Sequence, residues 1–128
     1  MLDVRHASFR DPAFIALARE HRCAVVFTDA ESYPSLPDVT ADFVYARLLM
    51  TAPDQPTGYS ADALDRWAER ARAWSRGERP ADLQAVNGED VAAPGGRDVF
   101  MYFINGAKER NPAAADALLR RLGLTPLV

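Results

Sequence analysis

The sequence predicts an α/β fold built on a parallel β-sheet, and two observations predict it. Segments with the apolar pattern of strands alternate along the chain with segments of helical period, which favours a parallel sheet with right-handed crossovers. One strand segment, Cys23–Phe27, is a continuous apolar run, which is typical of a strand covered on both faces. The expected order is β-α-β-(loop)-β-α-β-α.

The composition fits one globular domain. Of the 128 residues, 48% are apolar and 26% are charged, so disorder is not the default interpretation. The formal net charge of −3 argues against a nucleic-acid-coating role, while a local basic pocket stays open. The single cysteine, Cys23, cannot form an internal disulfide or a cysteine-based zinc cage. Without a signal-peptide pattern or an apolar run of about 20 residues, a cytoplasmic protein is expected.

The first half of the chain is expected to hold two strands and one helix. Alternation of apolar and polar side chains over residues 2–6 predicts a short strand. Asp11 and Pro12 then begin a helix, because Asp suits the N-cap and Pro suits the first helical turn. After the apolar strand, residues 30–40 contain two prolines and predict a loop.

The second half is expected to hold two strands and two helices. Its longest helix carries an apolar stripe that includes both tryptophans, which predicts packing against a core. In chain order the expected segments are strand 43–49, loop 51–59, a helix from Ser60, a flexible loop over 77–96, strand 99–104, and a helix from Asn111-Pro112 that ends at Gly123.

Polar side chains stand at the expected carboxyl ends of the strands, where parallel α/β proteins place their functional groups. Because side chains alternate along a strand, we expect these polar ends to share one face of the sheet, above an apolar floor. Strand ends are also polar because they meet solvent, and Arg and Asp pair simply to stabilise a sheet, so a structural network stays open beside a ligand site. The residues concerned are Asp3, Arg5, His6, Asp29, Tyr45, Arg47, Asn105 and Lys108.

The residue types suggest roles for these side chains. Arg5 and Arg47 suit a phosphate or carboxylate clamp, because the guanidinium fork matches both groups. The other expected binding residues are Tyr45, Asn105 and Lys108. The catalytic candidates are Asp3 or Asp29, as general base or orienting group, and His6 as a proton shuttle.

Motifs for known chemistry are absent. The chain has no Walker loop, no G-x-G-x-x-G, no G-x-S-x-G and no H-E-x-x-H. His6 alone lacks the companion ligands that a metal site needs. We therefore expect no metal and no cofactor.

Several segments, in order, carry a family resemblance. They are LDVRHASF at 2–9, FTD at 27–29, TADFVYARL at 40–48, YSADALDRWA at 59–68, VFMYFIN at 99–105 and the closing helix. These segments resemble EVRHPSF/W, VVAD, TADFVYVRLHG, YSDEELDRWA and VYVYFNN of the YecE-like family, domain of unknown function 72. The stretch 40–48 is the most specific, and the resemblance spans nearly the whole chain. Leu49-Met50 departs from the His-Gly that often follows in the family, which removes a candidate histidine.

The resemblance implies a TIM-type β/α barrel of unestablished biochemical function. It implies that residues 1–128 are a single partial barrel domain, the C-terminal half with strands five to eight. A complete barrel typically needs about 250 residues. Four parallel strands alone leave unpaired edges, so the resemblance also implies a partner, either a second copy or a complementary N-terminal half.

Two functions stay open from the sequence. The first is an enzyme or former enzyme that binds a small phosphate- or carboxylate-bearing ligand at the carboxyl ends of the strands. The alternative is a structural half barrel or truncated gene product, without catalytic activity, that needs a partner chain, because exposed edges and apolar patches are rarely left unpaired. The residues do not decide whether the chain is an enzyme.

Overall fold

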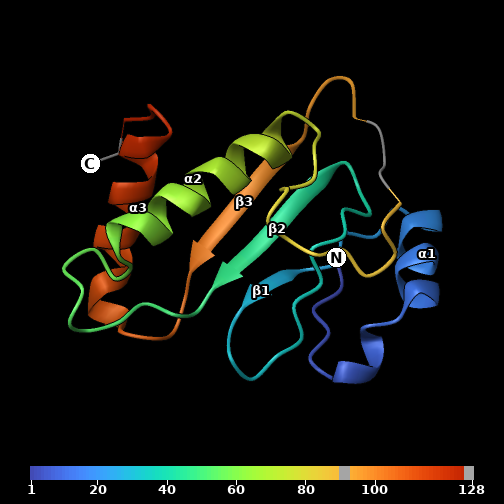
Figure 1. Cartoon of the computed structure of the whole chain (residues 1–128), viewed down its shortest axis with the longest axis horizontal. Coiled ribbons are helices and arrows are strands. Elements are labelled where there is room, and N and C mark those ends of the chain that lie inside the picture. The colour runs from blue at the N-terminus through green and yellow to red at the C-terminus, as the bar shows by residue number, and fades with distance from the viewer. Residues whose placement is uncertain (90–92, 126–128) are drawn as a thin grey trace.

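Three parallel strands form the sheet of the computed structural model, which describes residues 1–89 and 93–125. The strands are β1 (Phe27–Asp29), β2 (Phe43–Leu48) and β3 (Asp98–Phe103), in the spatial order β1-β2-β3 (Figure 1). The helices are α1 (Pro12–Glu20), α2 (Ala61–Ser75) and α3 (Asn111–Arg121), with short 3₁₀ helices η1 (Ala7–Phe9) and η2 (Lys108–Arg110). The α/β class and the parallel sheet are confirmed; the described residues form three strands where four were expected.

The strand expected over residues 2–6 was wrong beyond its first residue. Leu2 makes one isolated bridge to Val25: its N–H donates to Ala24 O at 2.7 Å, and its carbonyl accepts from the N–H of Val26 at 2.9 Å. Arg5 then donates to the carboxylate of Asp3 and to the hydroxyl of Tyr33, and the chain continues into η1. Asp3 accepts from Arg5 and from Arg47, and these side-chain contacts compete with strand pairing beyond Leu2.

The strand expected at 23–27 is displaced toward its carboxyl end, to 27–29. Thr40 explains the displacement, because its hydroxyl oxygen accepts the N–H of Val25 at 3.2 Å and donates to the carbonyl of Cys23 at 2.6 Å. Since β2 begins only at Phe43, this side chain satisfies backbone groups that a neighbouring strand would otherwise pair.

The predicted helix caps are confirmed for two helices and wrong for the third. Asp11 accepts the N–H of Ala13 at 2.7 Å at the start of α1, and Ser60 accepts the N–H of Ala63 at 3.2 Å at the start of α2. Asn111 is instead the first residue of α3, because η2 runs directly into that helix. Gly123 follows the end of α3 with a φ of +72°, as the C-terminal signal predicted.

One face of the β2–β3 pair packs against α2 and α3, which lie together at one end of the molecule (Figure 1). The apolar stripe of α2 is buried as predicted, with Trp67 and Trp74 only 3% and 0% exposed. Phe27 meets both indole rings edge-on, at centroid distances of 5.8 and 5.6 Å. These contacts tie β1 to α2 and complete the main core.

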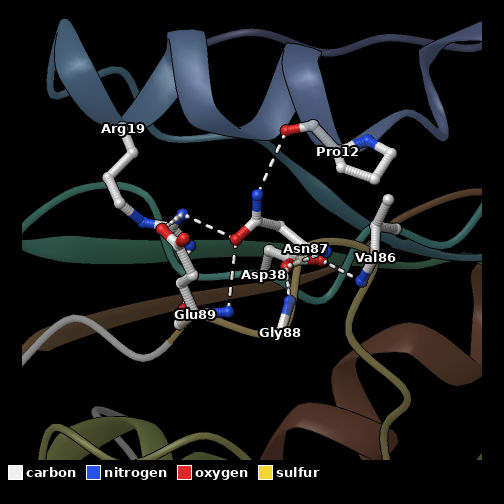
Figure 2. Close-up of polar contacts among 7 residues, drawn as sticks. All are labelled: Pro12, Arg19, Asp38, Val86, Asn87, Gly88 and Glu89. Carbon is white, nitrogen blue, oxygen red and sulfur yellow. Dashed lines mark hydrogen bonds and ion pairs between the residues drawn. The ribbon is translucent and has the colours of Figure 1, made fainter.

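A buried carboxylate between β1 and β2 holds the loop after α2, and the same loop bonds to the start of α1 (Figure 2). Asp38, 5% exposed, accepts the N–H groups of Val86 at 2.6 Å, Asn87 at 2.9 Å and Gly88 at 3.4 Å. The side chain of Asn87 then donates to the carbonyl of Pro12 at 3.2 Å, at the start of α1. We call this group the Asp38 clamp.

The connection expected to be a flexible loop, residues 77–96, contains no helix or strand in its described part. Residues 90–92 of this loop lie outside the described residues. The flexibility of the loop stays a prediction, to be weighed against the Asp38 clamp that holds residues 86–88. No helix of the described chain is long and apolar enough to cross a bilayer.

Candidate functional site

The register of the sheet divides the predicted site residues between its two faces. Ala46 pairs with Met101, on the face that α2 and α3 cover, whereas Arg47 pairs with Tyr102 on the open face. The expectation that the polar strand ends share one face was therefore wrong, because Asp29 and Arg47 lie on opposite faces. Alternation fixes direction within a strand, but the register between strands sets their relative phase, and one residue of offset exchanges the faces.

Three of the predicted residues meet on the open face; we call Asp3, Arg5 and Arg47 the arginine cluster. One oxygen of Asp3, Oδ2, accepts from Nη1 of Arg47 at 2.6 Å and from Nη2 of Arg5 at 3.1 Å. Arg5 also donates to the hydroxyl of Tyr33 at 3.2 Å and lies 4.7 Å above the centre of that ring. Segments far apart in the sequence thus converge on one carboxylate oxygen.

The arginine cluster carries two positive charges and one negative charge. The hydrogen bond to Asp3, followed by the one to Tyr33, raises the pKa of Arg5, which therefore stays charged. Arg47 is the more sheltered cation, with a side chain 18% exposed against 44% for Arg5. Within the described part of the chain, Arg47 donates one of its five N–H groups to Asp3, so other N–H groups are available to a further acceptor.

Asp29 belongs to a separate site, because it pairs in register with Leu48 on the helix-covered face. Its Oδ2 accepts from the hydroxyl of Tyr59 at 2.9 Å, and that hydroxyl accepts the N–H of Met50 at 3.0 Å. Burial raises the pKa of Asp29, although the Tyr59 hydrogen bond and the charge of Arg70 oppose it. Burial also raises the pKa of Tyr59, followed by the charge of Asp29. A cleft of about 460 Å³ lies beside these two groups.

His6 contacts Ser8 and caps the short helix η1. Its Nδ1 lies 2.7 Å from the hydroxyl of Ser8 and accepts the N–H of that residue at 3.2 Å, which caps η1. The role of His6 as a proton shuttle stays a prediction, with Nε2 as the ring nitrogen outside this contact.

The remaining predicted residues do not bond to the arginine cluster in the described structure. Asn105, with a φ of +60°, offers its carbonyl to the side-chain amide of Asn111 at 3.2 Å. Lys108 begins η2 and is exposed. Tyr45 stands on the open face two residues before Arg47, and its ring stacks on Tyr102.

Sequence reasoning missed three tyrosines. Tyr33 lies in a proline-broken loop that carries no signal of a contact with Arg5. Tyr59 stands just before a helix cap, where its contact with Asp29 depends on the fold. Tyr102 was not among the predicted site residues, and only the register between β2 and β3 places it beside Arg47.

The comparisons with known proteins give one match. A family model described as "Protein of unknown function DUF72" matches residues 1–127. No curated protein and no solved structure matches the chain significantly. The family resemblance is confirmed, while the correspondence to a C-terminal half barrel stays a prediction. Among the described residues, no group of three or more His, Cys, Asp or Glu side chains is arranged to hold a metal ion.

Proposed function

The chain belongs to the DUF72 family, whose function is unknown, and we propose that this protein binds a small phosphate- or carboxylate-bearing anion at the arginine cluster. The observation that carries the proposal is the shared oxygen of Asp3, which accepts from Arg5 at 3.1 Å and from Arg47 at 2.6 Å. Two guanidinium groups that reach one carboxylate oxygen have the spacing to reach one phosphate or carboxylate of a ligand.

Position and charge support the same proposal. Arg47 lies one residue before the end of β2, near the carboxyl edge of a parallel sheet, which is the usual edge for ligands in α/β folds. The excess positive charge of the cluster favours an anion. In this proposal Arg5 and Arg47 hold the ligand, and in the free protein Asp3 holds both guanidinium groups at one point. Asp29 takes no part, because its carboxylate lies on the other side of the sheet.

The test compares two arginine variants. Wild type should gain thermal stability from millimolar phosphate or sulfate, and Arg47→Ala should lose that gain. Arg76→Ala is the matched control, because it removes the same charge from an exposed ion pair with Glu78 on another part of the surface. Equal protection of wild type and Arg47→Ala by phosphate would overturn the proposal.

A second function is favoured by the exposed sheet. In the described structure β3 pairs with β2 alone, and Phe100 and Tyr102 are 44% and 43% exposed on the open face. A groove of about 490 Å³ follows β3 between α2 and α3, with Met101 and Leu118 among its apolar lining residues. These features support a sheet that another chain completes, as in a TIM-type barrel whose C-terminal half this chain supplies. The partner is a second copy or a complementary N-terminal half, and the cytoplasm is the proposed location.

Light scattering tests this second function. At micromolar concentration the purified chain should form a dimer or a larger species, because burial of an open edge and an apolar face favours association. If the chain stays a monomer at every concentration from about 1 to about 100 micromolar, the partner is not a second copy.

A further inference from the structure

Aromatic rings line the open face of the sheet beside the arginine cluster. Tyr45 and Tyr102 stack with their ring centres 4.9 Å apart and an interplanar angle of 27°. Phe43 and Phe100 meet edge-on at 6.1 Å. Tyr102 is 43% exposed, although tyrosine is a large amphipathic side chain that folded proteins usually bury in part. This face therefore offers ring surface to a ligand.

The register places one of these rings next to the proposed anion site. Arg47 and Tyr102 are direct partners in the β2–β3 ladder, so both side chains leave the same face of neighbouring strands, about 5 Å apart at the backbone. Tyr45, two residues earlier in β2, approaches Tyr102 from the amino-terminal side of the sheet. With one face of its ring stacked on Tyr45, Tyr102 is still 43% exposed, next to the strand position whose Arg47 side chain meets Asp3.

We propose that the ligand of this site carries a planar ring next to its anionic group, as an aryl phosphate or a nucleoside monophosphate does, and that Tyr102 stacks on that ring. The inference rests on the proposed anion site and adds the chemistry of the group attached to the anion. An ion pair fixes one end of such a ligand, and an aromatic face beside it selects for a flat, polarisable neighbour.

The size of the effect follows from stacking energies. A ring stacked on an aromatic side chain contributes about 1–3 kcal/mol, which corresponds to roughly 5- to 150-fold in affinity. AMP and phenyl phosphate should therefore bind at least about fivefold more tightly than inorganic phosphate. Adenosine, which lacks the anionic group, should bind far more weakly than AMP.

The experiment is calorimetric titration of the whole chain with phosphate, phenyl phosphate, AMP and adenosine. Tyr102→Leu should bring AMP and phenyl phosphate down to the affinity of phosphate and leave phosphate itself unchanged. Tyr102→Phe keeps the ring and should keep the preference. Phe100→Leu is the matched control. It removes a ring that is 44% exposed on the same face, two residues before Tyr102 in β3 and therefore further from the carboxyl edge.

The outcomes separate the two proposals. Phosphate binding without any preference for AMP or phenyl phosphate would overturn the ring inference and leave the anion site standing. Absence of binding by every anion would overturn the anion site itself. A preference that Tyr102→Leu and Phe100→Leu reduce equally would also reject the specific role of Tyr102. If Tyr102→Leu fails to fold, the wild-type comparison of phenyl phosphate with phosphate decides.

Discussion

Replacing Asp38 by Ala should remove the anchor of the loop after α2. The carboxylate makes two short hydrogen bonds to backbone N–H groups, 2.6 Å to Val86 and 2.9 Å to Asn87, and a weaker one at 3.4 Å to Gly88. A hydrogen bond to a charged group contributes about 1.5–3 kcal/mol, so the two short bonds together contribute about 3–6 kcal/mol. A domain of this size has a total stability of about 5–15 kcal/mol, so the loss should be large.

The assay has a global and a local measurement. Urea unfolding followed by tryptophan fluorescence reports the free energy of unfolding, because Trp67 and Trp74 are buried in the main core. Cleavage by thermolysin on the amino side of Val86, whose N–H Asp38 accepts, reports opening of the loop. If the lost energy is confined to the loop, cleavage should accelerate by about a hundredfold or more, the equivalent of about 3 kcal/mol.

The matched control is Glu89→Gln, in the same loop. Its carboxylate lies 3.6 Å from Arg19 and is 75% exposed, so this ion pair should contribute about 0–1 kcal/mol. An Asp38→Ala variant that unfolds within about 1 kcal/mol of wild type and is cleaved at the same rate would refute the reasoning, because Val86, Asn87 and Gly88 would all have lost their acceptor at no cost.

Substitutions of Trp74 and Asp29 test the main core and the site that holds Asp29. Trp74→Ala should cost about 3–5 kcal/mol in urea unfolding, because this fully buried ring packs on Phe27. Trp74→Phe should cost under about 2 kcal/mol, because it also deletes an indole N–H that has no hydrogen-bond partner among the described residues. Equal losses in the two variants would contradict the packing argument. Burial raises the pKa of Asp29 above its ordinary 3.8, so the folded state holds the proton more tightly and the free energy of unfolding should fall as pH rises through the interval between the two values. Asp29→Asn should remove this part of the pH dependence. The free energies of unfolding of the two proteins are compared at about pH 3.5 and about pH 7, on either side of that interval. The same difference at both pH values would show that the carboxylate does not titrate in this way.

The sequence carried most of the information on the fold. Apolar runs and helix caps are local features, so β2, β3 and the starts of α1 and α2 were predictable to within about one residue. The amino-terminal strand was not, because its fate depends on contacts with segments far along the chain. The displacement of β1 depends on the hydroxyl of Thr40, which no local pattern reveals.

The candidate site was predictable only in part. Arg5 and Arg47 were identified because parallel α/β proteins place functional groups at the carboxyl ends of their strands, and Asp3 was identified with them. The separation of Asp29 from this group follows from the register, where Asp29 faces Leu48 and Thr28 faces Arg47. Register between strands depends on which face of each strand is buried and on the connection between them, so alternation within one strand cannot supply it.

The carboxylate of Asp3 has a consequence for any anion that approaches Arg47. It already occupies the point where the two guanidinium groups converge, so it acts as an internal competitor, and an incoming anion must displace or share it. The measured affinity is then the intrinsic affinity multiplied by the fraction of molecules in which Asp3 has left the two guanidinium groups. Because the same carboxylate ties residues 2–6 to β2, an anion that displaces it also loosens the amino-terminal segment from the sheet.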